Sequence, residues 1–279
     1  MEKWMTVIEP KTKLFDLPLK EIWQYRNLIY RLVKRNYEIQ YKQTILGPAW
    51  MIFNLVLSSG LFSFIFGYVG NFSSENIPYF LFYMSGSVLW NFFSGCVMNN
   101  TRILLDNAYL FGKVYFPRLV VPVSNTLFEL IRFIVQMLIC CCAWGFYYIR
   151  GETQCMGVYL LLIPLLVLET GILGTAMGIL ISALTTKYRD LTHLVGFGMQ
   201  LLMYASPVLY PVSQFPVQLQ RLLLLNPMAS VIEGFRYAVT GSGQLRWGYL
   251  IYSVVFSLLI GIGSLLFFNQ VEKTFIDIV

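Results

Sequence analysis

Charged residues are scarce in this chain. They make up 12% of its 279 residues, whereas 57% are hydrophobic and the mean hydropathy is +0.64. Soluble domains carry about 25% charged residues. The composition therefore excludes an ordinary soluble domain and indicates a protein that lies mostly in a membrane.

The residues that usually perform catalysis or bind metals are also nearly absent. His193 is the only histidine, and no second histidine or cysteine stands near it to complete a metal site. No phosphate-binding loop of the form GxxxxGK[ST] occurs, since Gly112-Lys113 is followed by Val114. We expect no catalytic residue and no metal or cofactor in this chain, which is predicted not to be an enzyme.

Long apolar stretches dominate the rest of the sequence. A membrane helix needs about 20 mostly apolar residues to cross a bilayer. Six stretches meet that length, and the third starts between 119 and 133 and ends near 148; the others are 50–69, 77–98, 157–184, 194–212 and 248–268. The sequence predicts an all-α, polytopic membrane protein with six transmembrane helices.

The distribution of Lys and Arg predicts the orientation. Nine of the twenty basic residues precede residue 50, and the segments 99–119, 185–193 and 269–279 hold six more, against four on the opposite side. Positively charged segments stay in the cytoplasm. We expect both termini to be cytoplasmic, and this asymmetry accounts for the net charge of +6 without a nucleic-acid partner.

The chain divides into three parts. Residues 1–49 form a cytoplasmic N-terminal segment, residues 50–268 the six-helix membrane domain and residues 269–279 a cytoplasmic tail. From about residue 18, apolar side chains recur at helical spacing between basic ones. This pattern predicts an amphipathic helix in the membrane interface, or else one that packs on a protein partner.

The segment before the last span is also unusual. Two apolar runs of about ten residues, VQLQRLLLLN and MASVIEGFRYAV, are too short to cross the membrane and are separated by Asn226-Pro227. We expect re-entrant helices over about 214–239, with Pro227 starting the second one. Glu233 and Arg236 lie three residues apart and are predicted to pair at the rim.

Three ionisable residues fall inside the apolar stretches. Glu129 and Arg132 are three apart and can form a structural ion pair, or they serve transport. Glu169 has no evident partner, so it either lines a hydrated interior or pairs across helices. The aromatic residues Phe53, Tyr204 and Tyr210 either line an interior path or anchor the membrane interface.

The segment 101–119 is a candidate docking site for a partner protein. It is cytoplasmic by the charge distribution and carries apolar residues at helical spacing before Gly112. A short helix there with exposed apolar side chains predicts an interaction surface, although a loop folded back on the bilayer fits as well. The candidate contact residues are Ile103, Leu104, Asp106, Asn107, Leu110 and Phe111.

Several ordered motifs resemble one family. They are RNLIYRLVKRNYEIQYKQTILGPAW, KVYFPRLVVPV, KYRDL, SPVLYPVS and NPMASVIEGFR, and they extend over most of the chain. Together they resemble the membrane permease of bacterial ABC transporters that export lipid-linked polysaccharides such as O-antigen, teichoic acid or capsule-like polymers. The resemblance implies a protein of the bacterial cytoplasmic membrane.

The resemblance also implies an assembly. It predicts a homodimer with a path between its subunits, and a separate ATPase chain that binds ATP and Mg²⁺. It implies an interface helix at 18–35, a cytoplasmic gate helix at 36–49, a coupling helix at 101–111 and outer gate helices at 214–239. Asn36 and Asn54-Leu55 depart from the acidic residue and the proline step expected at those positions.

The stretch YKQTILGPAW then becomes the inner gate and its joint. Tyr41, Lys42, Gln43 and Thr44 offer donors to a phosphate or a sugar, and Gly47-Pro48 breaks the helix so that Trp50 anchors a span in a new direction. A simple interfacial turn with an anchoring tryptophan is the alternative.

Three functional classes follow from the sequence. We favour the permease subunit of an ATP-driven polysaccharide exporter. An ATP-independent flippase or secondary transporter is the first alternative, but it would show broken helices in two corresponding halves. A membrane-embedded glycan transferase is the second, but it would need a cluster of carboxylates or histidines.

Overall fold

A computed structural model describes residues 19–107, 109, 111, 116–154, 157–185 and 190–275; side chains are described only within 21–268. This part of the chain is helical and contains no strand, as the apolar stretches predicted. The α-helices are α1 (Leu19–Gln24), α2 (Arg26–Tyr41), α3 (Ala49–Phe62), α4 (Tyr79–Asn100), α5 (Ile103–Asp106), α7 (Val120–Ile149), α8 (Ile163–Thr185), α9 (Leu191–Tyr204), α10 (Val217–Leu223), α11 (Pro227–Thr240) and α12 (Trp247–Phe275).

Three short helical segments of other types complete the fold. A π-helix, η1 (Ser63–Val69), extends α3, and a 3₁₀-helix, η2 (Val158–Leu162), leads into α8. A second 3₁₀-helix, η3 (Val212–Gln214), precedes α10. Because η1 and η2 continue α3 and α8 without a break in the chain, each combined helix is long enough to cross a bilayer.

Five helices in the described residues have the length and apolar character of membrane spans. They are 49–69, 79–100, 120–149, 158–185 and 247–268. Their bounds agree with five of the six predicted stretches to within two residues. The start of the third stretch was predicted only to lie between 119 and 133, and the helix begins at 120.

The predicted fifth span is not a continuous helix over 194–212. Helix α9 has 14 residues and ends at Tyr204, so it is about 21 Å long and shorter than a hydrocarbon core of about 30 Å. The chain continues through turns from Ala205 to Tyr210. Hydropathy alone predicted the longer helix because these turn residues are as apolar as the helix before them.

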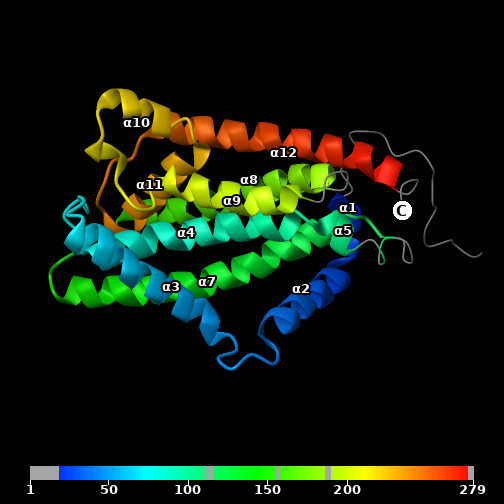
Figure 1. Cartoon of the computed structure of the whole chain (residues 1–279), viewed down its shortest axis with the longest axis horizontal. Helices are drawn as coiled ribbons and strands as arrows, with labels where there is room; N and C mark the ends of the chain where they lie inside the picture. The colour runs from blue at the N-terminus through cyan, green and yellow to red at the C-terminus, as the bar shows by residue number, and fades with distance from the viewer. Residues whose placement is uncertain are drawn as a thin grey trace, which may run out of the picture.

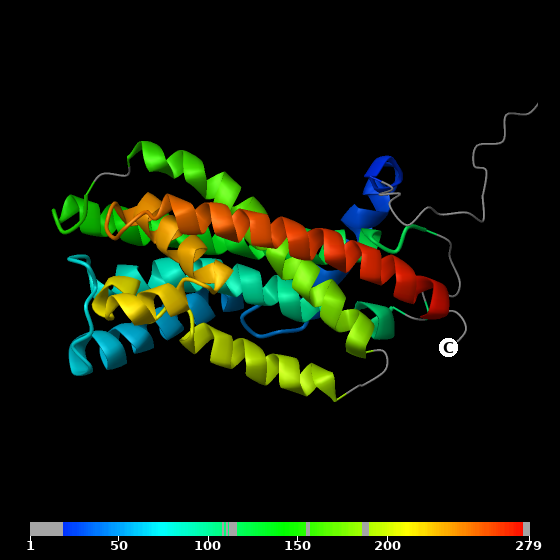
Figure 2. The same cartoon turned by 90° about the horizontal axis from the view of Figure 1, so that it is seen from above.

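Helix α4 lies at the centre of the bundle. It packs against α3, α7, α8, α9 and α11, and its side chains supply much of the main core. In Figure 1, α4 runs lengthwise between α7 on one side and α8 and α9 on the other, and Figure 2 shows α8 crossing the bundle obliquely. The fold therefore positions the other spans by their contacts with this helix.

The contact of α4 with α8 is unusually close. A Cβ atom on Gly174 would lie 2.7 Å from Cβ of Cys96, and one on Gly178 would lie 2.5 Å from Cβ of Asn100. Gly174 and Gly178 are four residues apart, which is the small-residue spacing that lets membrane helices approach each other. The backbones approach because these positions lack side chains.

The two ends of the bundle differ. Figure 1 shows α1, α5 and the last turns of α12 at one end, and α10 and the loops beside α11 at the other. We call the end with α5 the inner end, following the predicted orientation, and the end with α10 the outer end. The first and last described helices therefore lie at the same end.

The N-terminal helices differ from the predicted division at residue 36. The break falls at Tyr25, and α2 runs without interruption from Arg26 to Tyr41. Leu32 is buried where α2 packs against α7, whereas Trp23 and Tyr30 are 72% and 70% exposed. One face of this segment is thus fixed to the bundle, and the exposed aromatic side chains match an interfacial helix.

We expect Gly178→Ala to destabilise the protein. Its new methyl group would overlap Cβ of Asn100 and approach the carbonyl of Val97, and overpacking of this kind costs about 1–3 kcal/mol. Thermal unfolding in detergent should show a lower Tm than for the unchanged protein. Gly145→Ala in α7 is the matched control, since a Cβ there meets no atom within 4 Å; equal Tm values for both variants would contradict the close α4–α8 packing.

Candidate functional site

The joint between α2 and α3 lies where the sequence predicted it, but it is not helical. Residues 42–48 form turns, Gln43 and Gly47 adopt positive φ angles of 69° and 53°, and α3 begins at Ala49 directly after Pro48. Figure 1 shows α2 and α3 diverging from this loop as the two arms of a V. Gly47-Pro48 therefore does separate two helices of different direction, and the predicted gate helix is the end of α2.

The side chains of the joint divide by exposure. Lys42, Gln43 and Thr44 are exposed, and the Thr44 hydroxyl donates to the carbonyl of Tyr41 at 2.9 Å. Tyr41 is buried against Phe128 of α7, and burial raises the pKa of its phenol. The joint thus presents the exposed side chains of Lys42 and Gln43 on an anchored base, while their role in a gate stays a prediction.

A chain of amide side chains joins α2, α4 and α7. Asn36 donates to Asn125 at 2.9 Å, and Asn125 donates to the carbonyl of Asn99 and to the side chain of Asn100 at 2.9 and 3.1 Å. Asn36 is the residue that departs from the expected acidic one, and its amide can donate where a carboxylate could only accept. These contacts fix the C-terminal half of α2 to the bundle.

The predicted Glu129–Arg132 ion pair is present. The nearest oxygen and nitrogen atoms are 2.8 Å apart, and Asn99 donates to the same carboxylate. Glu129 is buried, whereas the side chain of Arg132 keeps 24% exposure. Gly95 permits this arrangement, because a Cβ there would overlap the Glu129 carboxylate. The pair is therefore a structural element of the α4–α7 contact that presents one cation toward the surface.

Glu169 of α8 lies between helices. Its carboxylate is 5% exposed and accepts a hydrogen bond from Ser253 of α12, while its second oxygen has no partner among the described residues. Of the two alternatives, contact across helices is the one that the geometry supports. Glu169 lies among packed helices in the monomer.

The predicted path-lining aromatic residues do not lie together in the core. Phe53 and Tyr204 are 45% and 48% exposed on α3 and α9, and Phe53 meets Trp50 edge to face with ring centroids 5.6 Å apart. Tyr210 donates its hydroxyl to the carbonyl of Tyr204 at 2.8 Å. Two of these side chains are therefore on the surface of the single chain.

The segment before α12 forms a helical hairpin. Helices α10 and α11 meet at Asn226-Pro227, where the Asn226 side chain accepts from the N–H of Met228 at 3.0 Å and Pro227 occupies the first helical turn. The predicted helix start at Pro227 is confirmed. Helix α11 is buried against α4, α8 and α12, whereas α10 has no buried residue.

The predicted ion pair between Glu233 and Arg236 does not form. Both residues lie in the described part of the chain, and neither comes within 4 Å of the other's charged atoms. Glu233 accepts from the N–H of Val212 at 3.0 Å, and Arg236 donates to the carbonyl of Pro207 at 2.7 Å. The sequence predicted that the two charged side chains would pair with each other. Instead, each one binds a backbone group in the segment that follows α9.

Arg236 is almost entirely buried. Its guanidinium lies 3.8 Å from the centroid of the Phe82 ring of α4, and a Cβ on Gly86 would come 2.8 Å from its Nη2. The guanidinium keeps its charge at neutral pH, because arginine does not lose its proton in proteins. Arg236 thus links α11 to α4 through the Phe82 ring, and to the turn after α9 through the Pro207 carbonyl.

The predicted docking segment is only partly a surface. Ile103 and Leu104 are 1% and 0% exposed, packed with Leu32 and Phe116, so they are not contact residues for a partner as predicted. Asn107 is also buried and accepts from Arg35 at 3.4 Å. Apolar periodicity predicted an exposed face here because it cannot tell which neighbour covers it.

Three positions of this segment remain at the surface. Arg102 and Asp106 form an exposed ion pair at 3.4 Å, and Tyr109 is 75% exposed. Phe111 is half-buried against Phe116, with ring centroids 5.6 Å apart. Leu110 lies outside the described residues.

The sequence did not predict the amide network, nor the cluster of three loops (75–77, 151–154 and 241–243) that forms a pocket. Asn125 and Gln136 lie inside the third apolar stretch. A polar amide in such a stretch indicates a hydrogen-bonding role, but the sequence was searched only for charged residues. Gln136 accepts from Asn91 at 3.3 Å and donates to the carbonyl of Met51 at 3.4 Å. Among the described residues no three His, Cys, Asp or Glu side chains come together, so the arrangement offers hydrogen bonds and charges.

Comparison with known proteins gives consistent matches. A family model described as ABC-2 type transporter matches residues 27–240. The O-antigen export system permease protein RfbA of Klebsiella pneumoniae is 27% identical over 252 residues, which cover 90% of this chain and 95% of that protein. A protein of the same name from Myxococcus xanthus is 30% identical over 223 residues, which cover 78% of this chain and 82% of that protein.

We expect Arg236→Met to loosen the turn after α9. The variant leaves the Pro207 carbonyl without its donor, and an unpaired buried polar group costs about 1–3 kcal/mol. In a background without the native cysteines, Val208→Cys should become reactive to a membrane-impermeant thiol reagent, because Val208 is otherwise fully buried. Arg221→Met on exposed α10 is the matched control and should leave the thiol protected; a protected thiol in both variants would refute the proposed link.

Proposed function

Since the chain belongs to the ABC-2 type transporter family, we propose that it is the membrane permease subunit of an ABC exporter that carries O-antigen polysaccharide across the cytoplasmic membrane. The observation that carries this assignment is the match to O-antigen export permeases over 90% of the chain. The bundle of apolar helices supports a multi-pass protein of the inner membrane.

We further propose a homodimer with the glycan path between its subunits. The centre of one bundle is filled by α4, whose residues Phe82, Leu89 and Val97 are fully buried. Helices α3 and α9 both pack on α4 and expose apolar side chains. A two-fold arrangement would place these helices on both sides of a shared path, with Phe53 and Tyr204 positioned to face it.

The joint between α2 and α3 is the proposed inner gate. Lys42 and Gln43 are exposed donors at this joint, and Thr44 is exposed beside them. A lipid-linked glycan would present a phosphate and sugar hydroxyls to these side chains. Tyr41 and the amide chain of Asn36 and Asn125 hold the base of the joint. The outer gate is the hairpin of α10 and α11, whose re-entrant position in the bilayer is part of the proposal.

A separate ATPase subunit is the proposed energy source. It would dock at the inner end on Arg102, Asp106 and Tyr109, which are the exposed residues around α5. Buried Ile103 and Leu104 would transmit the contact, since they fix α5 to α2, α7 and α8. In this proposal ATP and Mg²⁺ are bound by the partner, and both termini of the permease are cytoplasmic.

We expect Asp106→Arg to weaken the contact with the ATPase. The change breaks the exposed pair with Arg102 and reverses a charge on the docking surface. Co-purification of the ATPase with the tagged permease should fall at least several-fold while the amount of permease in the membrane stays constant. The control is Glu38→Arg, which breaks a comparable exposed pair with Lys34 on α2; an equal loss in both variants would contradict docking on α5.

Deleting the gene in its own host tests the function itself. We expect polysaccharide to disappear from the cell surface and its lipid-linked form to accumulate on the cytoplasmic side, with both defects reversed by a plasmid copy. Surface polysaccharide that persists at its normal level in the deletion strain would refute the assignment. Export that continues after loss of every candidate ATPase would favour an ATP-independent flippase.

A further inference from the structure

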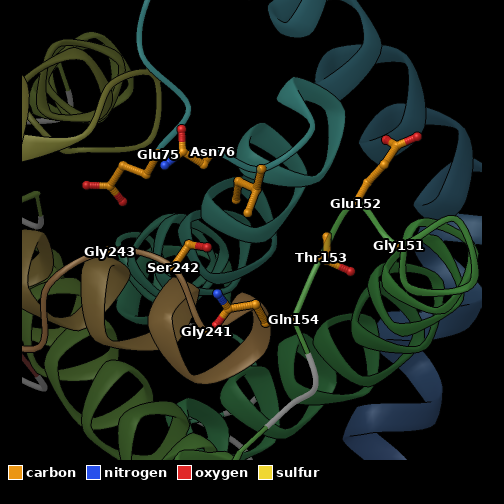
Figure 3. Close-up of a pocket in the computed structure, with 10 residues that line it drawn as sticks. Glu75, Asn76, Gly151, Glu152, Thr153, Gln154, Gly241, Ser242 and Gly243 are labelled. Atoms are coloured by element: carbon orange, nitrogen blue, oxygen red, sulfur yellow. The ribbon is translucent and has the colours of Figure 1, made fainter.

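A pocket of about 410 Å³ opens at the outer end of the bundle. Three loops that are distant in the sequence form it: residues 75–77 before α4, residues 151–154 after α7 and residues 241–243 after α11. Figure 3 shows the side chains of Asn76, Thr153, Gln154 and Ser242 from these loops around one space, with the carboxylates of Glu75 and Glu152 turned outward on its two sides. Its volume falls in the range of about 300–1,000 Å³ that is usual for ligand sites.

The lining of the pocket is almost entirely polar and has no cation. Its ten residues include two carboxylates, two amides, two hydroxyls and three glycines, and Ile77 is the only apolar one. None of the ten is Lys, Arg or His. Carboxylates accept hydrogen bonds, whereas amides and hydroxyls both donate and accept them. The site therefore suits a ligand with many hydroxyl groups and disfavours an anion.

One hydroxyl in the lining lacks a partner. Thr153 Oγ1 is buried and makes no hydrogen bond to protein atoms in the described part of the chain. Buried polar atoms are nearly always paired in proteins, by protein groups, water or a ligand. This oxygen is closed off from the open space, so the polar side chains that a ligand would meet in the pocket are those of Asn76, Gln154 and Ser242.

Glycines keep the rim of the pocket open. Gly241 and Gly243 have φ angles of 71° and 109°, which disfavour any side chain there. A Cβ on Gly243 would lie 2.8 Å from the Glu75 carboxylate, and one on Gly241 would lie 3.6 Å from Gln154. Side chains at these two positions would narrow the space in front of Glu75 and Gln154.

The pocket is joined to the outer hairpin. Glu75 accepts a hydrogen bond from Ser213 at 2.8 Å, and the preceding residue, Val212, donates its N–H to Glu233 of α11. Gly241 ends α11 directly. A ligand on Asn76 and Ser242 would thus lie within a few residues of the segment that closes the outer end.

We propose that this pocket binds a sugar unit of the exported polysaccharide as it emerges on the outer side, with neutral sugars preferred over acidic ones. The proposal rests on the assigned export function and adds a glycan site outside the path between subunits. Hydroxyl groups would bind Asn76, Gln154 and Ser242, and the carboxylates of Glu75 and Glu152 would repel uronic acids.

The test uses the full-length protein in lipid nanodiscs. The probe is the single repeat unit obtained by partial hydrolysis and size separation of the host's own exported polysaccharide, with trigalacturonate as the acidic comparison. Binding is followed by saturation-transfer NMR. We expect the repeat unit to bind and trigalacturonate to bind at least ten-fold more weakly. No binding of the repeat unit, or equal binding of both, would overturn the proposal.

Matched variants locate the site. Gln154→Leu removes an amide that lines the pocket and should weaken binding at least ten-fold, while Gln218→Leu on exposed α10 should leave it unchanged. Glu75→Gln should narrow the difference between neutral and acidic probes. Unchanged binding in Gln154→Leu, or binding that requires added Ca²⁺, would overturn the sugar site.

Failure of this proposal is separable from failure of the assigned function. Export is measured in cells by surface polysaccharide, independently of probe binding. If the unchanged protein restores export but does not bind the repeat unit, the pocket proposal is refuted and the export function stands. If it does not restore export in its deletion strain, the export function itself is refuted.

Discussion

The hydrogen bond from Arg236 to the carbonyl of Pro207 is the contact on which the outer half of the structure depends. Helix α9 stops after 14 residues, and the backbone that follows keeps only a few turn hydrogen bonds. In apolar surroundings such backbone is stable only if other protein groups satisfy it. Arg236 and Glu233 do so from α11, at Pro207 and at Val212, and so a short buried helix holds an interrupted span in place.

Helix α4 carries this arrangement along the bundle. Near its outer end, Phe82 and Gly86 receive the guanidinium of Arg236; farther in, Cys96 and Asn100 lie against the glycines of α8. Asn99, next to that contact, binds Glu129 on α7, and its carbonyl accepts from Asn125. One packed helix therefore contacts the proposed outer gate, the middle of the bundle and the support of the inner joint. A displacement at either end has to be accommodated by α4, because its close contacts leave little free volume.

The sequence predicted what depends on length and local chemistry. Apolar runs of about 20 residues placed five spans, Asn226-Pro227 placed a helix start, and Gly47-Pro48 placed a break. It failed where the outcome depends on a neighbour. Ile103 and Leu104 have the spacing of an exposed face but are covered by Leu32 and Phe116. Arg236 and Glu233 have the spacing of an ion pair, but backbone left open by α9 binds each more directly. The outer pocket had no signal, because it consists of three loops that only the fold brings together.

The distribution of polar groups limits where a hydrophilic polymer can pass. Within one chain, Glu129 is paired and Glu169 is hydrogen-bonded among packed helices, so neither lines an open passage in the monomer. Exposed polar side chains lie instead at the joint 42–44 and at the outer pocket. The surface between them is formed by α3 and α9, where exposed residues such as Phe53 and Tyr204 are aromatic and apolar. Aromatic faces can contact sugar rings without fixing their hydroxyls, so a polymer can advance along them without strong binding at each unit. A single copy would leave that surface open to lipid, which is why the proposed path requires a second copy to enclose it.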